Sequence, residues 1–392
     1  MRLATLSHLI AAEDAADMAA ASACEDLADA PMADAAAEVP AGGVGGKSPY
    51  GARLEDTNLD SLDEILVTSP GQTVVVDPAE GGGISSWDLR ASRVALASVL
   101  RRRPEAYHQR LVAHDQEAVE EALGEFEAAA LVEEGAAPGG DAAAAATEAP
   151  KTIHDTVNVK EPGLAAFLHY DRHERRSGLV HLLPADGSTG VAQLTHATYL
   201  ELGDFVEGVF EAITISDGRL VLRRLGNFDL DGTGRPLIMT KTFSFGGGRS
   251  DPTLELQVEV ENPGELALSF ELAVEWNVNL LGGGHNPAAY YETETGERTP
   301  HDAAGEVASA SKLAFGNDYE GVRVEATAEP SARLTWYPVE TVSNSEAGFE
   351  RVYQGSSLLF RWPVVLAPRG RRAFAVSFAV TQRIDHTAAE SS

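Results

Sequence analysis

Residues 254–280 read LELQVEVENPGELALSFELAVEWNVNL and contain two runs in which apolar and polar residues alternate. In the first run, 254–261, the apolar side chains share one side and the acidic and amide side chains share the other. The second run, 266–276, places an apolar residue at every second position and ends at Trp276. A period of two indicates a β-strand with one buried face. Since Asn262-Pro263-Gly264 is typical of a turn, the stretch predicts a β-hairpin.

The apolar side chains of these two runs are expected to lie in a core. They are Leu254, Leu256, Val258, Val260, Leu266, Leu268, Phe270, Leu272, Val274 and Trp276. A two-stranded hairpin is at best marginally stable in water, so this apolar face needs a second sheet packed against it. The stretch therefore predicts an antiparallel β-sandwich.

The remaining sequence supports a mainly β protein with a short N-terminal helical segment. Strand patterns recur from residue 151 onward and are clearest at 373–380, where apolar residues alternate. Helical patterns are confined to the first 30 residues, to a run that begins at Ser92, and to Tyr107–Glu127. The predicted divisions are a helical segment with an Ala/Gly/Pro-rich linker at 1–49, strands plus helices that start the sandwich at 50–134, a flexible low-complexity loop at 135–150, and the β-sandwich at 151–392.

Composition restricts the classes of partner. The chain of 392 residues has 60 acidic and 30 basic residues and a formal net charge of −30, which argues against nucleic acid or an anionic membrane surface as a ligand. The single cysteine, Cys24, excludes an internal disulfide framework. No apolar stretch of the length of a membrane span and no signal peptide is present, so a cytoplasmic protein is expected.

An acidic loop at 56–64, DTNLDSLDE, is a candidate cation site. Asp56, Asn58, Asp60 and Glu64 place oxygen-bearing side chains at alternate positions, and calcium prefers six to eight oxygen ligands. Ser61 and the absence of a later glutamate separate the loop from an EF-hand. The sequence therefore predicts a calcium site here, with an acidic turn before a strand as the alternative.

Three other stretches contain residue types that occur in nucleotide-binding, catalytic or sugar-binding sites. Residues 41–48, AGGVGGKS, resemble a phosphate-binding loop but lack the preceding strand and following helix that such a loop needs, so nucleotide binding is not expected. The cluster at 169–176, HYDRHERR, is interpreted as a salt-bridge network at a strand end, with acid–base or metal chemistry as the alternative. Glu275-Trp276 could form an acid and a stacking platform for a sugar, but the alternation predicts that Trp276 lies in the core.

Several motifs together resemble the C-terminal half of the α-amylases and 4-α-glucanotransferases of glycoside hydrolase family 57. They occur in the family's order. They are GGISSWDLR at 82–90, RRPEAYH at 102–108, YDR at 170–172 with RSGL at 176–179, ELGDFV at 201–206 and GFERVYQGS at 348–356.

This resemblance implies a β-sandwich of the galactose-mutarotase-like supersandwich type beside the catalytic barrel of an enzyme acting on starch or glycogen. The family's nucleophile and general acid lie on that upstream barrel, for which the chain has no segment, so we assign no catalytic residue. The expected partners are an α-glucan and a catalytic-barrel protein. We assign contacts with the glucan to His285 and Asn286, in a glycine-rich loop, and to Tyr353, in the last of the similar motifs.

The function predicted from the sequence is thus a non-catalytic module or subunit of an α-amylase or 4-α-glucanotransferase. Two alternatives remain open. The chain could be a free-standing carbohydrate-binding module, or an α-glucan-active enzyme whose site is rebuilt around His173, Glu174 or His285.

Overall fold

The computed structural model describes residues 2–28, 50–133, 157–230 and 232–383, which form two compact units. The first unit contains the described parts of Met1–Leu100, His173–Val339 and Gln354–Ser392, and the second contains those of Arg101–Arg172 and Glu340–Tyr353. The phosphate-loop-like stretch, the N-terminal linker and the predicted loop at 135–150 lie outside the described residues. No helix among the described residues is long and apolar enough to cross a membrane.

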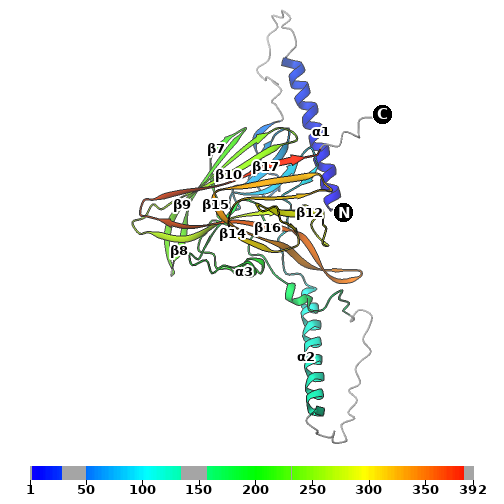
Figure 1. Cartoon of the computed structure of the whole chain (residues 1–392). Helices are drawn as coiled ribbons and strands as arrows, with labels where there is room; N and C mark the ends of the chain where they lie inside the picture. The colour runs from blue at the N-terminus through cyan, green and yellow to red at the C-terminus, as the bar shows by residue number, and fades with distance from the viewer. Residues whose placement is uncertain (1, 29–49, 134–156, 231, 384–392) are drawn as a thin grey trace, which may run out of the picture. The chain divides into compact units, whose positions relative to one another are not determined.

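The elements of the described chain are mostly strands (Figure 1). In chain order they are α1 (Arg2–Ala28), β1 (Gly51–Glu55), β2 (Glu64–Thr68), β3 (Gln72–Asp77), β4 (Gly83–Leu89), β5 (Val94–Ala95), α2 (His108–Glu133), the 3-10 helix η1 (Leu164–Phe167), β6 (Leu179–Leu183), α3 (Val191–Thr195), β7 (Glu211–Ser216), β8 (Arg219–Leu230), β9 (Thr233–Gly247), β10 (Pro252–Glu261), β11 (Leu268–Val278), β12 (Ala289–Thr293), β13 (Arg298–Pro300), β14 (Gly305–Asn317), β15 (Val322–Ser345), β16 (Gly348–Leu366) and β17 (Arg371–Gln382).

Two sheets organise the first unit. The smaller one has the strand order β1-β2-β3-β4-β5. The larger one runs β13-β12-β14-β15-β17-β10-β9-β8-β7, and Figure 1 shows its long strands β8 and β9 running side by side. Strands β6, β11 and β16 extend this sheet away from that path, because β16 pairs with β15 and β11 pairs with both β16 and β6. The predicted mainly antiparallel β architecture is therefore confirmed.

The predicted hairpin between β10 and β11 is wrong. Both edges of β10 are already paired, with β9 and with β17, and both edges of β11 are paired with β6 and β16. A strand has only two hydrogen-bonding edges, so the two runs are not partners of each other. In the connecting loop, buried Asn262 donates its side-chain amide to the carbonyl oxygens of Leu266 (2.7 Å) and Ala367 (3.1 Å).

The apolar faces of the strands meet in one core, which confirms the predicted sandwich. The Trp276 ring of β11 lies 4.2 Å from the Phe378 ring of β17, centroid to centroid. Trp87 of β4 contacts both rings edge-on, at 6.2 and 5.6 Å, so the smaller sheet shares this core. Phe228 of β8 and Phe270 of β11 pack at 5.4 Å in the same cluster.

The alternation located the core residues of β10 and β11 with one error. Nine of the ten predicted side chains are no more than 1% exposed, but Leu266 is 63% exposed. The reason is that β11 begins at Leu268, so Leu266 belongs to the connecting loop. The face of β11 opposite Trp276 is also buried and carries Glu271, Ala273, Glu275 and Asn277.

Two helical predictions met different outcomes. The run from Ser92 is not helical: Val94 and Ala95 form β5, which pairs with β4. The acidic helix predicted at Tyr107–Glu127 is confirmed as α2, His108–Glu133. Tertiary pairing to the edge of the smaller sheet thus overrode the helical spacing after Ser92.

Charged contacts attach α1 to the first unit. The helix is present as predicted, but of its expected apolar stripe Ile10 is buried while Leu9 is 55% exposed. Buried Asp14 accepts from Arg249 at 2.6 Å, and Asp17 pairs with buried Arg90 at 2.5 Å. The helix is therefore attached to the sheets by ion pairs as well as by an apolar contact.

The second unit has its own small core of Leu111, Leu164, Val342 and Phe349. The buried guanidinium of Arg102 pairs with Asp171 at 2.7 Å, and Asp171 also accepts from the Arg102 backbone amide at 2.8 Å.

The difference between Leu266 and Leu268 leads to a stability prediction. Leu268→Ala removes a fully buried side chain and is expected to lower the free energy of unfolding by about 2–5 kcal/mol. Leu266→Ala removes an exposed side chain and is expected to change it by less than about 0.5 kcal/mol. Urea denaturation of both variants measures the two values, and equal losses would contradict a β11 strand that begins at Leu268.

Candidate functional site

The most concentrated group of ionisable side chains in the first unit surrounds Glu275. The alternation of β11 points Trp276 into the main core and Glu275 to the opposite face, where the neighbouring strands β6 and β16 bring other polar residues close. His181 of β6 is paired with Ala273, two residues from Glu275, and Ser357 of β16 is paired with Asn277 on the other side. Diagonal neighbours of this kind lie within reach across an antiparallel sheet.

Glu275 is buried and accepts hydrogen bonds from five groups. Its Oε1 accepts from Arg175 Nη1 (2.7 Å), Asn277 Nδ2 (2.9 Å) and Ser357 Oγ (3.2 Å). Its Oε2 accepts from His181 Nε2 (2.8 Å) and His173 Nε2 (3.1 Å). Burial by itself raises the pKa of Glu275, but the Arg175 charge and the histidine hydrogen bonds outweigh it and hold the pKa well below its usual range.

His181 lies between two carboxylates. Its Nδ1 is 2.8 Å from Glu201 Oε2, and its Nε2 is 2.8 Å from Glu275 Oε2. Ionised carboxylates only accept hydrogen bonds, so both ring nitrogens must carry a proton and the ring is an imidazolium. Burial lowers the pKa of His181, and the hydrogen bonds to Glu201 and Glu275 more than offset it, raising the pKa to about 9.

Both carboxylates of this cluster are paired without a metal. Glu275 faces Arg175 and the His181 imidazolium, and Glu201 faces His181 from the other side. A buried charge is costly unless it is paired and hydrogen-bonded, and each of these carboxylates has such a partner. We therefore interpret the cluster first as an ion network that neutralises the polar face of β11.

The same cluster is the one metal-compatible group found among the described residues. One ligand atom from each of His173, His181 and Glu275 lies within 4.8 Å of the others, a donor set that suits zinc. Each histidine nitrogen, however, is at hydrogen-bonding distance from the carboxylate. To bind here, a metal cation would have to displace the His181 proton and lie beside the positively charged Arg175. The donor atoms therefore suit a metal ion, but the positive charge of Arg175 disfavours one.

The predicted calcium loop is closed by its own hydrogen bonds. Asp56 accepts from the backbone amides of Asp60 and Ser61, both at 3.1 Å, and Asp60 accepts from that of Leu62 at 2.8 Å. Buried Glu64 accepts from the amide of Thr57 at 2.7 Å. In this conformation the side-chain oxygens of the loop accept hydrogen bonds from the loop's own backbone amides, as they do at Asp56, Asn58, Asp60 and Glu64. Calcium binding stays a prediction.

The residues assigned to glucan contact are divided between the units. His285, whose side chain is 90% exposed, and Asn286 lie in the loop between β11 and β12, where His285 pairs with Asp302 at 2.8 Å. Half-buried Tyr353 lies in the part of β16 that belongs to the second unit. The structure thus places His285 and Asn286 in one loop and leaves the role of all three residues a prediction.

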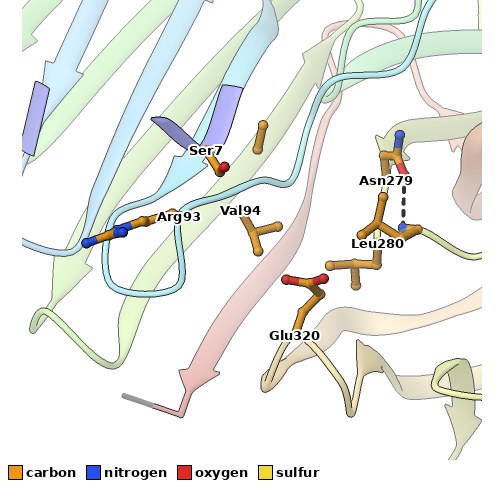
Figure 2. Close-up of a pocket in the computed structure, with 8 residues that line it drawn as sticks. Ser7, Arg93, Val94, Asn279, Leu280 and Glu320 are labelled. Atoms are coloured by element: carbon orange, nitrogen blue, oxygen red, sulfur yellow. Dashed lines mark hydrogen bonds between the residues drawn. The ribbon is translucent and has the colours of Figure 1, made fainter. Parts of the chain in front are cut away.

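That loop begins at a pocket of about 260 Å³ in the first unit (Figure 2). Asn279, Leu280 and Leu281 form one wall, Arg93–Ala95 a second, and Ser7 and Glu320 complete the lining. Asn286 donates its side-chain amide to the Leu281 carbonyl at 3.0 Å, so the predicted glucan loop supports this wall. Figure 2 shows the Glu320 carboxylate pointing toward Val94 and the Arg93 side chain directed away from Glu320.

Sequence reasoning identified part of the Glu275 cluster and missed the rest. The interpretation of 169–176 as a salt-bridge network agrees with the contacts of His173 and Arg175 to Glu275. Half-buried Glu174 is not in the cluster. His181 and Glu201 were missed, although a histidine within the apolar strand LVHLL is itself a signal that a buried partner is required.

These observations define a β-sandwich with a buried ion network and an open pocket at its loops, and comparison with known proteins is consistent with that class. Residues 56–376 match the family model described as alpha-amylase/4-alpha-glucanotransferase, C-terminal. The chain belongs to this family.

Several known proteins are similar to this chain over part of their length. "Alpha-amylase 1" of Dictyoglomus thermophilum is 29% identical over 312 residues, which are 79% of this chain and 39% of the relative. The crystal structure of 4-alpha-glucanotransferase from Thermococcus litoralis has a TM-score of 0.58 at 20% identity and covers 83% of this chain and 39% of that one. A galactose mutarotase-like protein from Lactobacillus casei ATCC 334 has a TM-score of 0.45 at 8% identity, covering 81% of this chain and 99% of that one. The chain therefore spans about two fifths of the curated relatives that it matches.

The ion network leads to a pH prediction for His181. Its folded pKa of about 9 is above the ordinary value of 6.5, so its stabilising contribution is complete below pH 6.5 and is lost as pH rises through 9. Buried Lys241, whose burial lowers its pKa from 10.5 to about 7, changes stability in the opposite direction over the same range. The effect of His181 must therefore be measured as a difference between proteins.

His181→Gln is expected to be less stable than the unmodified protein at pH 7, and the gap in the free energy of unfolding should shrink by about 1.4 kcal/mol per pH unit toward pH 9. Urea denaturation at pH 7, 8 and 9 provides the measurement. His196→Gln makes the same change at an exposed position and is the matched control. A gap for His181→Gln that does not vary with pH would show that the ring is not an imidazolium.

Calcium binding by the acidic loop is tested by thermal unfolding with added calcium. If the loop binds the ion, calcium at one hundred times its dissociation constant adds about 2.7 kcal/mol to the free energy of unfolding, and Asp60→Asn removes most of this gain. Asp318→Asn, an exposed carboxylate outside the loop, is the control. An unfolding midpoint that does not respond to calcium would leave the loop as a self-capped acidic turn.

Proposed function

We propose that this chain is the sandwich module of an α-glucan-processing enzyme and works with a catalytic barrel. The observation that carries the proposal is the extent of the match. A model of C-terminal domains covers residues 56–376, whereas the matched relatives are more than twice as long as the aligned region. The active part of such an enzyme would lie in the remaining length.

The chemistry of the buried cluster supports a non-catalytic role. Retaining glycoside hydrolysis requires a nucleophilic carboxylate and a proton-donating carboxyl group about 5–5.5 Å apart across the scissile bond. Glu275 is buried, paired with Arg175 and surrounded by donors. A carboxylate held in this way is a poor nucleophile, because its charge is already stabilised and a substrate does not reach it.

The proposed ligand is an α-glucan, in keeping with the names of the relatives. The acidic surface of a chain with net charge −30 does not exclude it, because a neutral polysaccharide is not repelled. We further propose the cytoplasm as its compartment, since a chain with one cysteine has no disulfide framework suited to an oxidising one.

A second candidate function is a free-standing carbohydrate-binding module. The exposed Tyr319, 86% accessible, favours it, because an exposed aromatic ring offers an apolar face to a sugar ring. The two proposals differ in whether a catalytic partner is needed.

Co-expression with a barrel-only protein from the same genome tests the leading proposal. We expect the two chains to co-elute in size-exclusion chromatography and to redistribute the lengths of maltooligosaccharides faster than the barrel protein alone. The chain alone should leave the oligosaccharides unchanged. Absence of both co-elution and rate gain would contradict the proposal, and redistribution by the purified chain alone would favour the rebuilt-site enzyme.

A further inference from the structure

Side-chain hydrogen bonds hold the pocket between β5 and the loop after β11. Asn317, which is 1% exposed, donates its side-chain amide to the Leu280 carbonyl at 2.8 Å and accepts from the backbone amide of Glu320 at 3.2 Å. Asn279 donates its side-chain amide to the Gln354 carbonyl at 3.0 Å and accepts from the Leu281 amide at 3.0 Å. The buried Asn317 amide therefore joins the two sides of the pocket, and the half-buried Asn279 amide holds its wall.

Two lining residues hold an unfavourable backbone conformation. Arg93 and Leu281 both have φ of 58°, in the left-handed region that costs a side-chain-bearing residue about 1–2 kcal/mol. Such strain persists only where the surrounding structure imposes it, and it concentrates at ligand sites.

The lining combines apolar side chains with a carboxylate that can accept hydrogen bonds, and this combination suits a neutral ligand with both apolar and hydroxyl-bearing faces. Val94, Leu280 and Leu281 are apolar, and the half-buried Glu320 carboxylate points toward Val94 (Figure 2). Among the described residues, no hydrogen bond or ion pair engages this carboxylate. It therefore retains its capacity to accept hydrogen bonds from a ligand, while the net charge of −30 disfavours an anionic one.

We propose that this pocket binds one ring of an α-glucan, with Glu320 accepting hydrogen bonds from sugar hydroxyl groups and the leucines and Val94 covering an apolar face of the ring. Tyr319 precedes Glu320 in the same exposed turn and is a platform on which the adjoining part of the glucan can stack. The volume of about 260 Å³ is near the lower end of ligand pockets, which suits a single ring. This inference rests on the proposed function, because it takes the glucan as the ligand.

Isothermal titration with maltotriose and electrophoresis in glycogen-containing gels test this site on the full chain. Glu320→Gln keeps the shape of the side chain and removes its charge, and Glu320→Ala removes the acceptor. Both are expected to raise the dissociation constant for maltotriose about tenfold or more, the effect of losing a hydrogen bond to a charged group. Tyr319→Ala is expected to raise it a few-fold.

Glu297→Gln removes the same charge at an exposed position away from the pocket lining and should bind as the unmodified chain does. An unchanged unfolding midpoint in each variant shows that lost binding is not lost folding. Retardation of the unmodified chain by glycogen together with undiminished binding by both Glu320 variants would overturn the pocket and leave the glucan proposal intact.

Two further outcomes overturn the inference for other reasons. If the unmodified chain shows neither retardation nor heat with maltotriose, glucan binding itself fails. If n-butylammonium binds in a Glu320-dependent way and maltotriose does not, the pocket is a site for a cationic group.

Discussion

The burial of β11 on both faces is the constraint on which the rest of the first unit depends. One face places Trp276 against Phe378 in the main core, and the other places Glu275 in the interior. A lone buried carboxylate would cost several kcal/mol, so the chain must bring Arg175 and His181 to it. The positions of β6 and of the segment before it follow from this requirement.

Two buried basic side chains in the same unit are also hydrogen-bonded, one to a carboxylate and a carbonyl and the other to carbonyls alone. Arg361 of β16 is fully buried and donates to Glu271 of β11 at 2.6 Å and to the Thr189 carbonyl at 2.7 Å. Lys241 of β9, also fully buried, donates to the carbonyls of Gly81 at 2.6 Å and Gly178 at 2.7 Å. These contacts join β11, β16 and the two sheets through hydrogen bonds that apolar packing alone would not specify.

This organisation separates the buried ion network from the open pocket. The ionisable side chains around Glu275 lie inside the sandwich and are paired with one another. The open pocket, in contrast, is formed by strand ends and loops around Asn317. A rigid scaffold that presents loops is the usual arrangement in binding modules. It is consistent with a family whose relatives are α-amylases and 4-α-glucanotransferases and of whose length this chain spans about two fifths.

The sequence by itself determined the buried faces of β10 and β11, apart from Leu266, because a period of two depends only on neighbours along the chain. It also led to the interpretation of 169–176 as a salt-bridge network and placed His285 and Asn286 in a glycine-rich loop. It did not determine strand pairing: the pattern of β10 and β11 specifies a buried face but not which strand lies at each edge, so the predicted hairpin was wrong. Only the tertiary structure decided that Leu266 is exposed, that the run after Ser92 is an edge strand, and that Glu275 meets His181, because those outcomes depend on contacts between segments far apart in the sequence.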